Sequence, residues 1–149
     1  MPKSLNQADY KSLAELRYQI RRFLHFSEQA ARAAGLEPRQ HQLLLAIKGL
    51  PRGLRPRIRD LAERLKIRHH SAVELANRLT LAGYVRRQRG GADRREVLLS
   101  LTPKGERILR KLALHHWTEL GTAGPALLTA LSRVVNSARS PAKPRKSKS

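Results

Sequence analysis

The first helical pattern runs from Asp9 to Ala34, where apolar residues recur at spacings of three and four. That spacing places them on one face of an α-helix, which Gly35 ends. An apolar stripe this long on the first helix of a small domain must pack against something. Either the rest of the same domain or a second copy of the chain buries it. The stripe consists of Leu13, Leu16, Ile20, Phe23 and Leu24.

Three shorter helical patterns follow. The first begins at Pro38, which suits the first turn of a helix, and ends at Gly49. A proline- and glycine-rich loop separates it from a helix at about 58–66, and a third helix covers about 69–82. The apolar positions of these helices are Leu43, Leu44, Leu45, Ile47, Leu61, Ala62, Leu65, Val73, Leu75 or Ala76, Leu79 and Leu81.

A β-hairpin is predicted next, with strands at 84–89 and 96–101. Between them, Gly90-Gly91 and the following Ala-Asp have turn chemistry, because glycine accepts positive φ without steric cost. Five arginines surround this turn. Their ordinary explanation is solvation, and the alternative is contact with phosphate. They are Arg86, Arg87, Arg89, Arg94 and Arg95.

The C-terminal part begins with Thr102-Pro103, a favourable helix start. We expect a helix from there to about Leu120, a break at 121–125, and a last amphipathic helix that carries Leu127, Leu131 and Val134. Residues 1–8 are expected to form a flexible arm. The basic, acid-free segment 138–149 is expected to be disordered.

The chain is strongly basic, with 31 Lys and Arg against 11 Asp and Glu and a formal net charge of +20. A polyanionic partner explains such an excess: double-stranded DNA is favoured, and an anionic membrane surface is the rival. No apolar run reaches the ~20 residues that a membrane span needs, and the chain start lacks a signal core, which favours a cytoplasmic protein. The absence of cysteine excludes disulfides and thiolate metal sites.

The order of two short helices, a tight turn between them and a hairpin is that of a winged helix-turn-helix. The second helix of this motif enters a DNA major groove, where polar residues near its N-terminal end meet base edges. A thin hairpin tip fits the minor groove, whose negative potential attracts arginine. The residues expected at the DNA are Arg57, Arg68, His69, His70, Ser71, Glu74, Arg78, Arg86, Arg87, Arg89, Asp93, Arg94 and Arg95.

Several segments together resemble the MarR family, the multiple-antibiotic-resistance type of bacterial transcriptional regulators. In the DNA-binding part they read DLAERL, SAVELANRL, AGYV, DRR and LSLTPKG, and in the flanking helices LEPRQHQLLLAI and GTAGP. The resemblance covers residues 9–137, with a DNA-binding lobe at about 38–101. It implies a mainly α fold with a small β-wing, in which a winged helix-turn-helix is flanked by N- and C-terminal dimerisation helices, about 9–35 and 103–137.

The resemblance also implies partners and a mode of action. Family members are homodimers that bind pseudo-palindromic operators, usually as repressors associated with the nucleoid, and many are released by a small aromatic or anionic inducer. The residues assigned to the dimer interface are Leu13, Leu16, Ile20, Leu127, Leu131 and Val134.

Four departures from the family pattern stand out. Asn77 replaces a common aspartate, which removes a partner for neighbouring arginines. Gly90-Gly91 replaces an Asp-Pro pair, which predicts a more flexible tip. Glu37 and Arg57 replace helix-capping Ser or Thr. The added charge and flexibility favour nonspecific affinity at the expense of sequence discrimination.

Other chemistry finds less support. The adjacent pairs His69-His70 and His115-His116 point about 100° apart on a helix, so neither pair chelates a metal from one face. His25 and His41 could approach each other across helices, but we expect no metal or cofactor. Trp117, with its histidine neighbours, is either packed or part of a ligand pocket. No nucleotide loop, HExxH spacing or nucleophile elbow is present, so an enzyme is not expected.

Two rival functions remain. One is an architectural or RNA-binding protein that reads little sequence, which the charge of +20 favours. The other is a winged-helix module whose arginines meet acidic protein partners. The polar side chains at the start of the second helix favour sequence-specific DNA binding over both.

Overall fold

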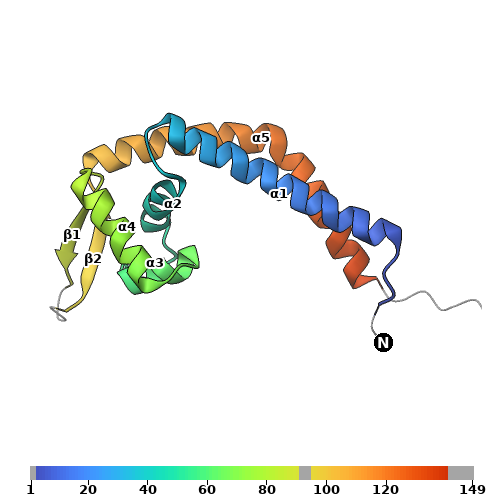
Figure 1. Ribbon diagram of the computed structural model, residues 1–149, viewed down its shortest axis with the longest axis horizontal. Coiled ribbons are helices and arrows are strands. Elements are labelled where there is room, and N and C mark those ends of the chain that lie inside the picture. The colour runs from blue at the N-terminus through green and yellow to red at the C-terminus, as the bar shows by residue number, and fades with distance from the viewer. Residues whose placement is uncertain (1–2, 91–94, 141–149) are drawn as a thin grey trace, which may run out of the picture. The chain divides into compact units, whose positions relative to one another are not determined.

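The structure is a computed structural model that describes residues 3–90 and 95–140. In these residues the chain forms five helices and one hairpin (Figure 1). Two compact units result. We call residues 27–116 the winged-helix lobe, and residues 3–26 with 117–140 the helical unit. The elements are α1 (Gln7–Ala33), α2 (Pro38–Lys48), α3 (Ile58–Leu65), α4 (His69–Leu81), β1 (Val85–Arg89), β2 (Val97–Leu101) and α5 (Pro103–Arg139).

Leucines from every element type fill the core of the winged-helix lobe. The buried residues of α4 recur at the three- and four-residue spacing of one helix face, so the opposite face is left to solvent. Leu45 and Leu81, which we expected in the core, are instead exposed, at 49% and 89%. The largest fully buried side chains are Leu36, Leu43, Leu44, Leu61, Leu79 and Leu99.

A tight turn joins α3 to α4. Lys66 ends α3 in the left-handed conformation, with φ of 54°. The N–H groups of Lys66 and Ile67 donate to the carbonyls of Glu63 and Ala62, both at 3.1 Å, which satisfies the end of α3. Arg68 then precedes α4 in an extended conformation, without a side-chain cap. The two helices therefore have the short connection that a helix-turn-helix requires.

The hairpin pairs β1 with β2 in antiparallel register, from Val85 opposite Leu101 to Arg89 opposite Val97. A positive φ of 80° at Gly83 allows the chain to turn from α4 into β1. The expected start of the next helix is confirmed, because the hydroxyl of Thr102 accepts a hydrogen bond from the N–H of Gly105 at 3.1 Å. The predicted fold class, mainly α with a small β-wing, is confirmed.

The predicted break at residues 121–125 is wrong. α5 continues through it as one helix of 37 residues, with Pro125 in its interior. A proline removes one helical N–H donor, here the one that would reach the carbonyl of Gly121. Both Gly121 and Pro125 are exposed, so water can bond that carbonyl, and Gly121 has no side chain to crowd the proline ring. The rule that proline ends a helix fails here. The lost hydrogen bond and the clash of the proline ring with the preceding turn both cost little at this position.

The helical unit consists of the first part of α1 and the last part of α5. At the start of α1, the Asn6 side chain accepts from the N–H of Asp9 and the Asp9 side chain accepts from the N–H of Asn6, both at 3.0 Å. The Asp9 carboxylate also accepts from Lys3 at 2.6 Å and from Ser137 at 3.0 Å, which ties the start of α1 to the end of α5. These contacts lower the pKa of Asp9, the Lys3 hydrogen bond most of all.

Candidate nucleic-acid interface

The exposed face of α4 carries most of the residues predicted to read bases. Arg68, His69 and His70 are exposed at its start, and Ser71 is half-buried. One turn further, Glu74 accepts a hydrogen bond from Arg78 at 2.7 Å, with both side chains more than 60% exposed. The buried residues of α4 lie on the opposite face, so the core fixes which side of the helix meets a ligand.

The wing places its arginines beside this face. Arg86, Arg87 and Arg89 are exposed along β1, and Arg95 is exposed just before β2. The guanidinium of Arg87 donates to the amide oxygen of Asn77, which joins the hairpin to α4 directly. Asp93 and Arg94, also predicted at the DNA, lie outside the described residues.

Arg57 differs from the other predicted contacts because its charge is shared within the protein. Its Nε donates to Asp60 at 2.7 Å and lies 3.3 Å from Glu96, and the side chain is 33% exposed. The Asp60 hydrogen bond, the largest cause, raises the pKa of Arg57. The structure therefore places Arg57 at the edge of the wing, next to β2, rather than on the exposed face of α4.

Comparison with known proteins agrees with this geometry. Residues 34–96 match the sequence model of the MarR family. The winged-helix lobe is a MarR-family domain. The predicted family is therefore confirmed, and it is a family of transcriptional regulators rather than enzymes. No curated protein sequence matches the chain.

Solved structures show how far this fold extends along the chain. AbsC, a MarR family transcriptional regulator from Streptomyces coelicolor, is 23% identical, with a TM-score of 0.73 over 93% of this chain and 94% of that chain. CouR, a transcriptional repressor solved with a 23-mer DNA duplex, is 25% identical, with a TM-score of 0.64 over 92% and 100%. MarR from E. coli is 17% identical, with a TM-score of 0.61 over 89% and 98%.

Two departures from the MarR-family pattern have a structural answer. The expectation that Asn77 deprives nearby arginines of a partner is wrong, because its amide oxygen accepts from Arg87. Glu37 also keeps a partner at the start of α2, where its N–H donates to the side chain of Gln40 at 2.9 Å. Asn77 therefore still partners an arginine, whereas Glu37 forms no side-chain cap hydrogen bond and keeps the bond from its N–H to Gln40.

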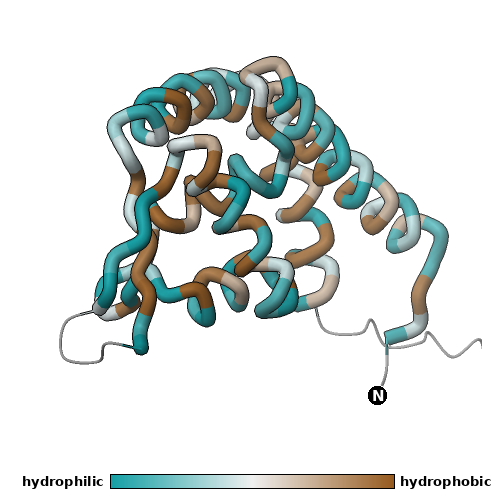
Figure 2. Tube along the Cα trace, turned by 60° about the vertical axis from the view of Figure 1, so that its left-hand side comes forward, coloured by the Kyte–Doolittle hydropathy of each residue, from teal (hydrophilic) through white to brown (hydrophobic). Residues whose placement is uncertain are grey.

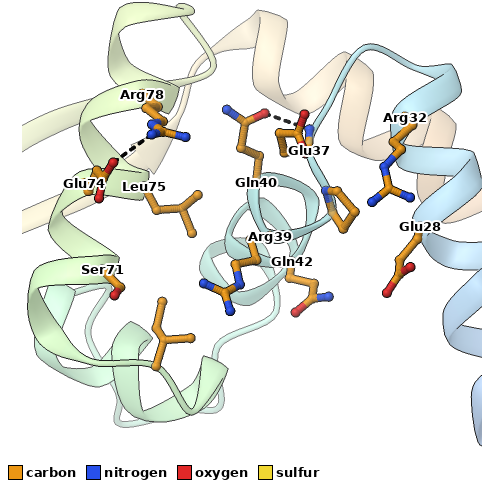
Figure 3. Close-up of a pocket in the computed structure, with 12 residues that line it drawn as sticks. Glu28, Arg32, Glu37, Arg39, Gln40, Gln42, Ser71, Glu74, Leu75 and Arg78 are labelled. Atoms are coloured by element: carbon orange, nitrogen blue, oxygen red, sulfur yellow. Dashed lines mark hydrogen bonds and ion pairs between the residues drawn. The ribbon is translucent and has the colours of Figure 1, made fainter.

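A cavity of about 660 Å³ adjoins α4 in the MarR-family domain (Figure 3). The end of α1, the start of α2 and one side of α4 line it, and its volume lies in the usual range for small-ligand sites. Leu75 supplies apolar surface, while Arg39 and Arg32 supply positive charge. Ser71, Glu74 and Arg78, all predicted at the DNA, form its α4 wall. The sequence pattern did not indicate this cavity.

Two histidines meet in the interior of the MarR-family domain, but they are not the pair that the sequence suggested. His41 lies against His116, with ring centroids 5.0 Å apart. His116 contacts the Leu112 carbonyl at 2.7 Å and the Ser27 hydroxyl at 2.8 Å. His41 is 4% exposed, and burial, aided by the charge of His116, lowers its pKa to about 4.

Metal and membrane hypotheses gain nothing from the described residues. Among them, no three His, Asp or Glu side chains lie close enough together to hold a metal ion. Nor does any helix of residues 3–90 and 95–140 have the length and apolar character that crossing a membrane requires.

Proposed function

We propose that the protein is a sequence-specific double-stranded DNA-binding transcriptional regulator that acts as a homodimer on a pseudo-palindromic operator. One observation carries the proposal: the exposed polar face of α4 and the arginine-bearing hairpin are joined by the Arg87–Asn77 contact. The pair brings exposed polar side chains and arginines together, as a winged helix-turn-helix does when it contacts a duplex. Two proteins of similar fold support it, because CouR was solved bound to a DNA duplex and a MepR mutant bound to an oligodeoxyribonucleotide.

In this function α4 lies in the major groove and the wing in the flanking minor groove. Arg68 and the two histidines meet base edges near the start of α4, where arginine pairs best with guanine. Arg86 and Arg89 face phosphates along the hairpin, and Arg95 reaches the minor groove. Arg57 acts indirectly, because its guanidinium already binds two carboxylates.

A second copy of the chain is the proposed cover for the helical unit. Leu13 and Leu131 are exposed there, at 44% and 46%, together with Trp117 at 82% and Leu128 at 65%. Exposed apolar side chains at this density mark an association surface. Leu16 and Ile20, also predicted at the interface, are half-buried within the helical unit, as are Leu127 and Val134.

Repression and its release by a small ligand complete the proposal. A regulator of this kind represses by occupying an operator that polymerase needs. A small aromatic anion is the proposed inducer, and the cavity beside α4 offers it Leu75 for the ring and Arg39 for the charge. A ligand there would touch Ser71 and Arg78, so it would compete directly with DNA.

Footprinting of genomic DNA with the purified protein tests the proposal, because the protected fragments themselves reveal the operator sequence. Affinity is then compared between that operator and a scrambled duplex. If a dimer neutralises about eight phosphates, log K falls with log salt at a slope near −7. Arg95→Ala should weaken operator binding and leave the dimer intact. An unchanged affinity would count against the wing assignment.

A second function, architectural binding with little sequence reading, is favoured by the net charge of +20. It predicts equal affinity for operator and scrambled duplex, whereas specific regulators differ by a factor of at least about 10³. The same titration therefore separates the two.

A further inference from the structure

Glu96 lies just before β2, at the turn end of the wing, with its carboxylate between two arginines. One carboxylate oxygen accepts from Nη1 of Arg55 at 2.6 Å, and the other lies 3.3 Å from Nε of Arg57. The Glu96 side chain is only 11% exposed. Arg57 continues the chain of contacts to Asp60 at 2.7 Å. We call Arg55, Arg57, Asp60 and Glu96 the wing cluster.

Backbone contacts run alongside the wing cluster. The N–H of Leu99 in β2 donates to the carbonyl of Pro56 at 2.9 Å, and Arg57 pairs with Leu98 as an isolated antiparallel bridge. The segment 55–57 therefore lies along the outer edge of β2. Side-chain and backbone contacts together fix the hairpin to the chain that leads into α3.

Gly90 fits against the same carboxylate. Its N–H donates to the backbone carbonyl of Glu96 at 2.8 Å. A Cβ at position 90 would lie 2.6 Å from Oε2 of Glu96 and 3.3 Å from Arg55, closer than a carbon atom can approach that oxygen. No side chain fits here without moving the carboxylate, so the buried glycine and the wing cluster depend on each other.

We propose that Glu96 is a positioning residue for DNA binding: by holding Arg55 and Arg57, it sets the direction in which the wing presents its arginines. The inference rests on the proposed DNA-binding function. A hairpin of two strands has little stability of its own, so the direction of its turn depends on what else holds it. The wing cluster holds the turn end, and Glu96 is the member that the hairpin itself contributes.

The proposal predicts an effect of unusual sign. Replacing an acid by a neutral residue in a basic protein ordinarily strengthens DNA binding, because it removes repulsion from phosphates. Glu96→Gln should instead weaken operator binding about tenfold, the effect of losing one directed contact. The slope of log K against log salt should also become less steep by about one. A variant that merely unfolded more easily would keep the salt slope of its folded fraction.

Two further variants separate position from charge. Gly90→Ala changes no charge, but its Cβ displaces the Glu96 carboxylate from Arg55, so it should weaken binding in the same direction and by a similar factor. Glu106→Gln is the matched control, because Glu106 also pairs with a cation, Lys48 at 2.9 Å, but joins α5 to α2. It should leave operator affinity unchanged or raise it slightly.

Hydrogen exchange gives a readout that does not require DNA. The amides of Gly90 and Leu99 should exchange faster in Glu96→Gln and Gly90→Ala than in the wild type, and at the wild-type rate in Glu106→Gln. Unchanged affinity in Glu96→Gln, or weaker binding without faster exchange, would overturn the proposal. So would an unaffected Gly90→Ala variant. If the wild type itself binds no duplex, the proposed function fails, and the exchange measurements still decide whether Glu96 holds the wing.

Discussion

The winged-helix lobe and the helical unit use the same apolar spacing but bury it to different extents. Among the described residues, every buried apolar side chain except Ala130 lies in the lobe. Most of the large apolar side chains that stay exposed lie in the helical unit, including Trp117 and Leu128. Figure 2 shows apolar and hydrophilic positions alternating along the long helices as well as in the lobe. Periodicity therefore reveals that an apolar face exists, but not what covers it.

This difference divides the work of a regulator between the two regions. The lobe buries its own apolar side chains, so it can hold α4 and the wing in fixed positions relative to each other. In the proposed homodimer, the exposed apolar face of the helical unit would pair with a second copy, and the helical unit would then set how many lobes act together. The changes below test this division, from the largest expected effect to the smallest.

Charging the apolar face of the helical unit should abolish association. In the double variant Leu128→Glu with Leu131→Glu, two carboxylates would have to be buried without partners, which a dimer cannot tolerate. We expect monomers by light scattering, and operator affinity at least about a hundredfold weaker, because two linked half-sites no longer bind together. Leu81→Glu, at a still more exposed leucine of the lobe, should remain dimeric. A stable dimer of the double variant would mean that this face is not the interface.

Truncation of a core leucine should affect the lobe in a different way. Leu79 is fully buried, so Leu79→Ala should cost about 2–5 kcal/mol of unfolding free energy at any protein concentration. Trp117→Ala, in the helical unit, should lower stability only at concentrations where the dimer forms. Urea titrations at two concentrations compare them. If both variants lost the same free energy of unfolding in dilute solution, the proposed difference between the lobe and the helical unit would be wrong.

The sequence predicted those features whose cause is local. Thr102-Pro103 starts α5 as expected because capping depends on neighbours along the chain. The α4 core face also follows from spacing alone. Pro125 shows the limit of such rules. The free-energy cost of a proline inside a helix depends on its exposure to water and on the residue four positions earlier, and here an exposed position and a glycine keep that cost small.

Features made by distant residues could not be predicted in this way. Glu96 and Arg55 are 41 positions apart, and nothing in either neighbourhood indicates the ion pair. His41 meets His116 rather than His25, because the choice depends on how α2 and α5 pack. The i,i+3 spacing of Arg57 and Asp60 was the one local signal that Arg57 has a partner inside the protein.

Acid should destabilise the lobe through His41. Its pKa is lowered to about 4 in the fold, against 6.5 unfolded, so between these values the unfolded chain binds a proton that the folded chain excludes. The contribution of His41 is complete above pH 6.5 and is lost as pH falls toward 4, by at most about 3 kcal/mol. His41→Gln should flatten the pH dependence of unfolding in this window, and His25→Gln, at an exposed position, should not. If His41→Gln left the pH dependence of unfolding unchanged, a group other than His41 would cause the acid sensitivity.

The smallest expected effect is in the helical unit, at Pro125. Pro125→Ala supplies the N–H that the carbonyl of Gly121 lacks and restores an unbroken ladder in α5. Proline costs ~3 kcal/mol relative to alanine inside a helix, but hydration of the exposed carbonyl already offsets much of this. We therefore expect a gain of about 1 kcal/mol, visible as a small rise in the melting midpoint and slower amide exchange around residue 125. The apolar face that we propose as the dimer interface should be unaffected, so the dimer dissociation constant should stay the same. A weaker dimer in this variant would instead show that the proline shapes the interface, and the helical unit would then have a specified geometry of its own.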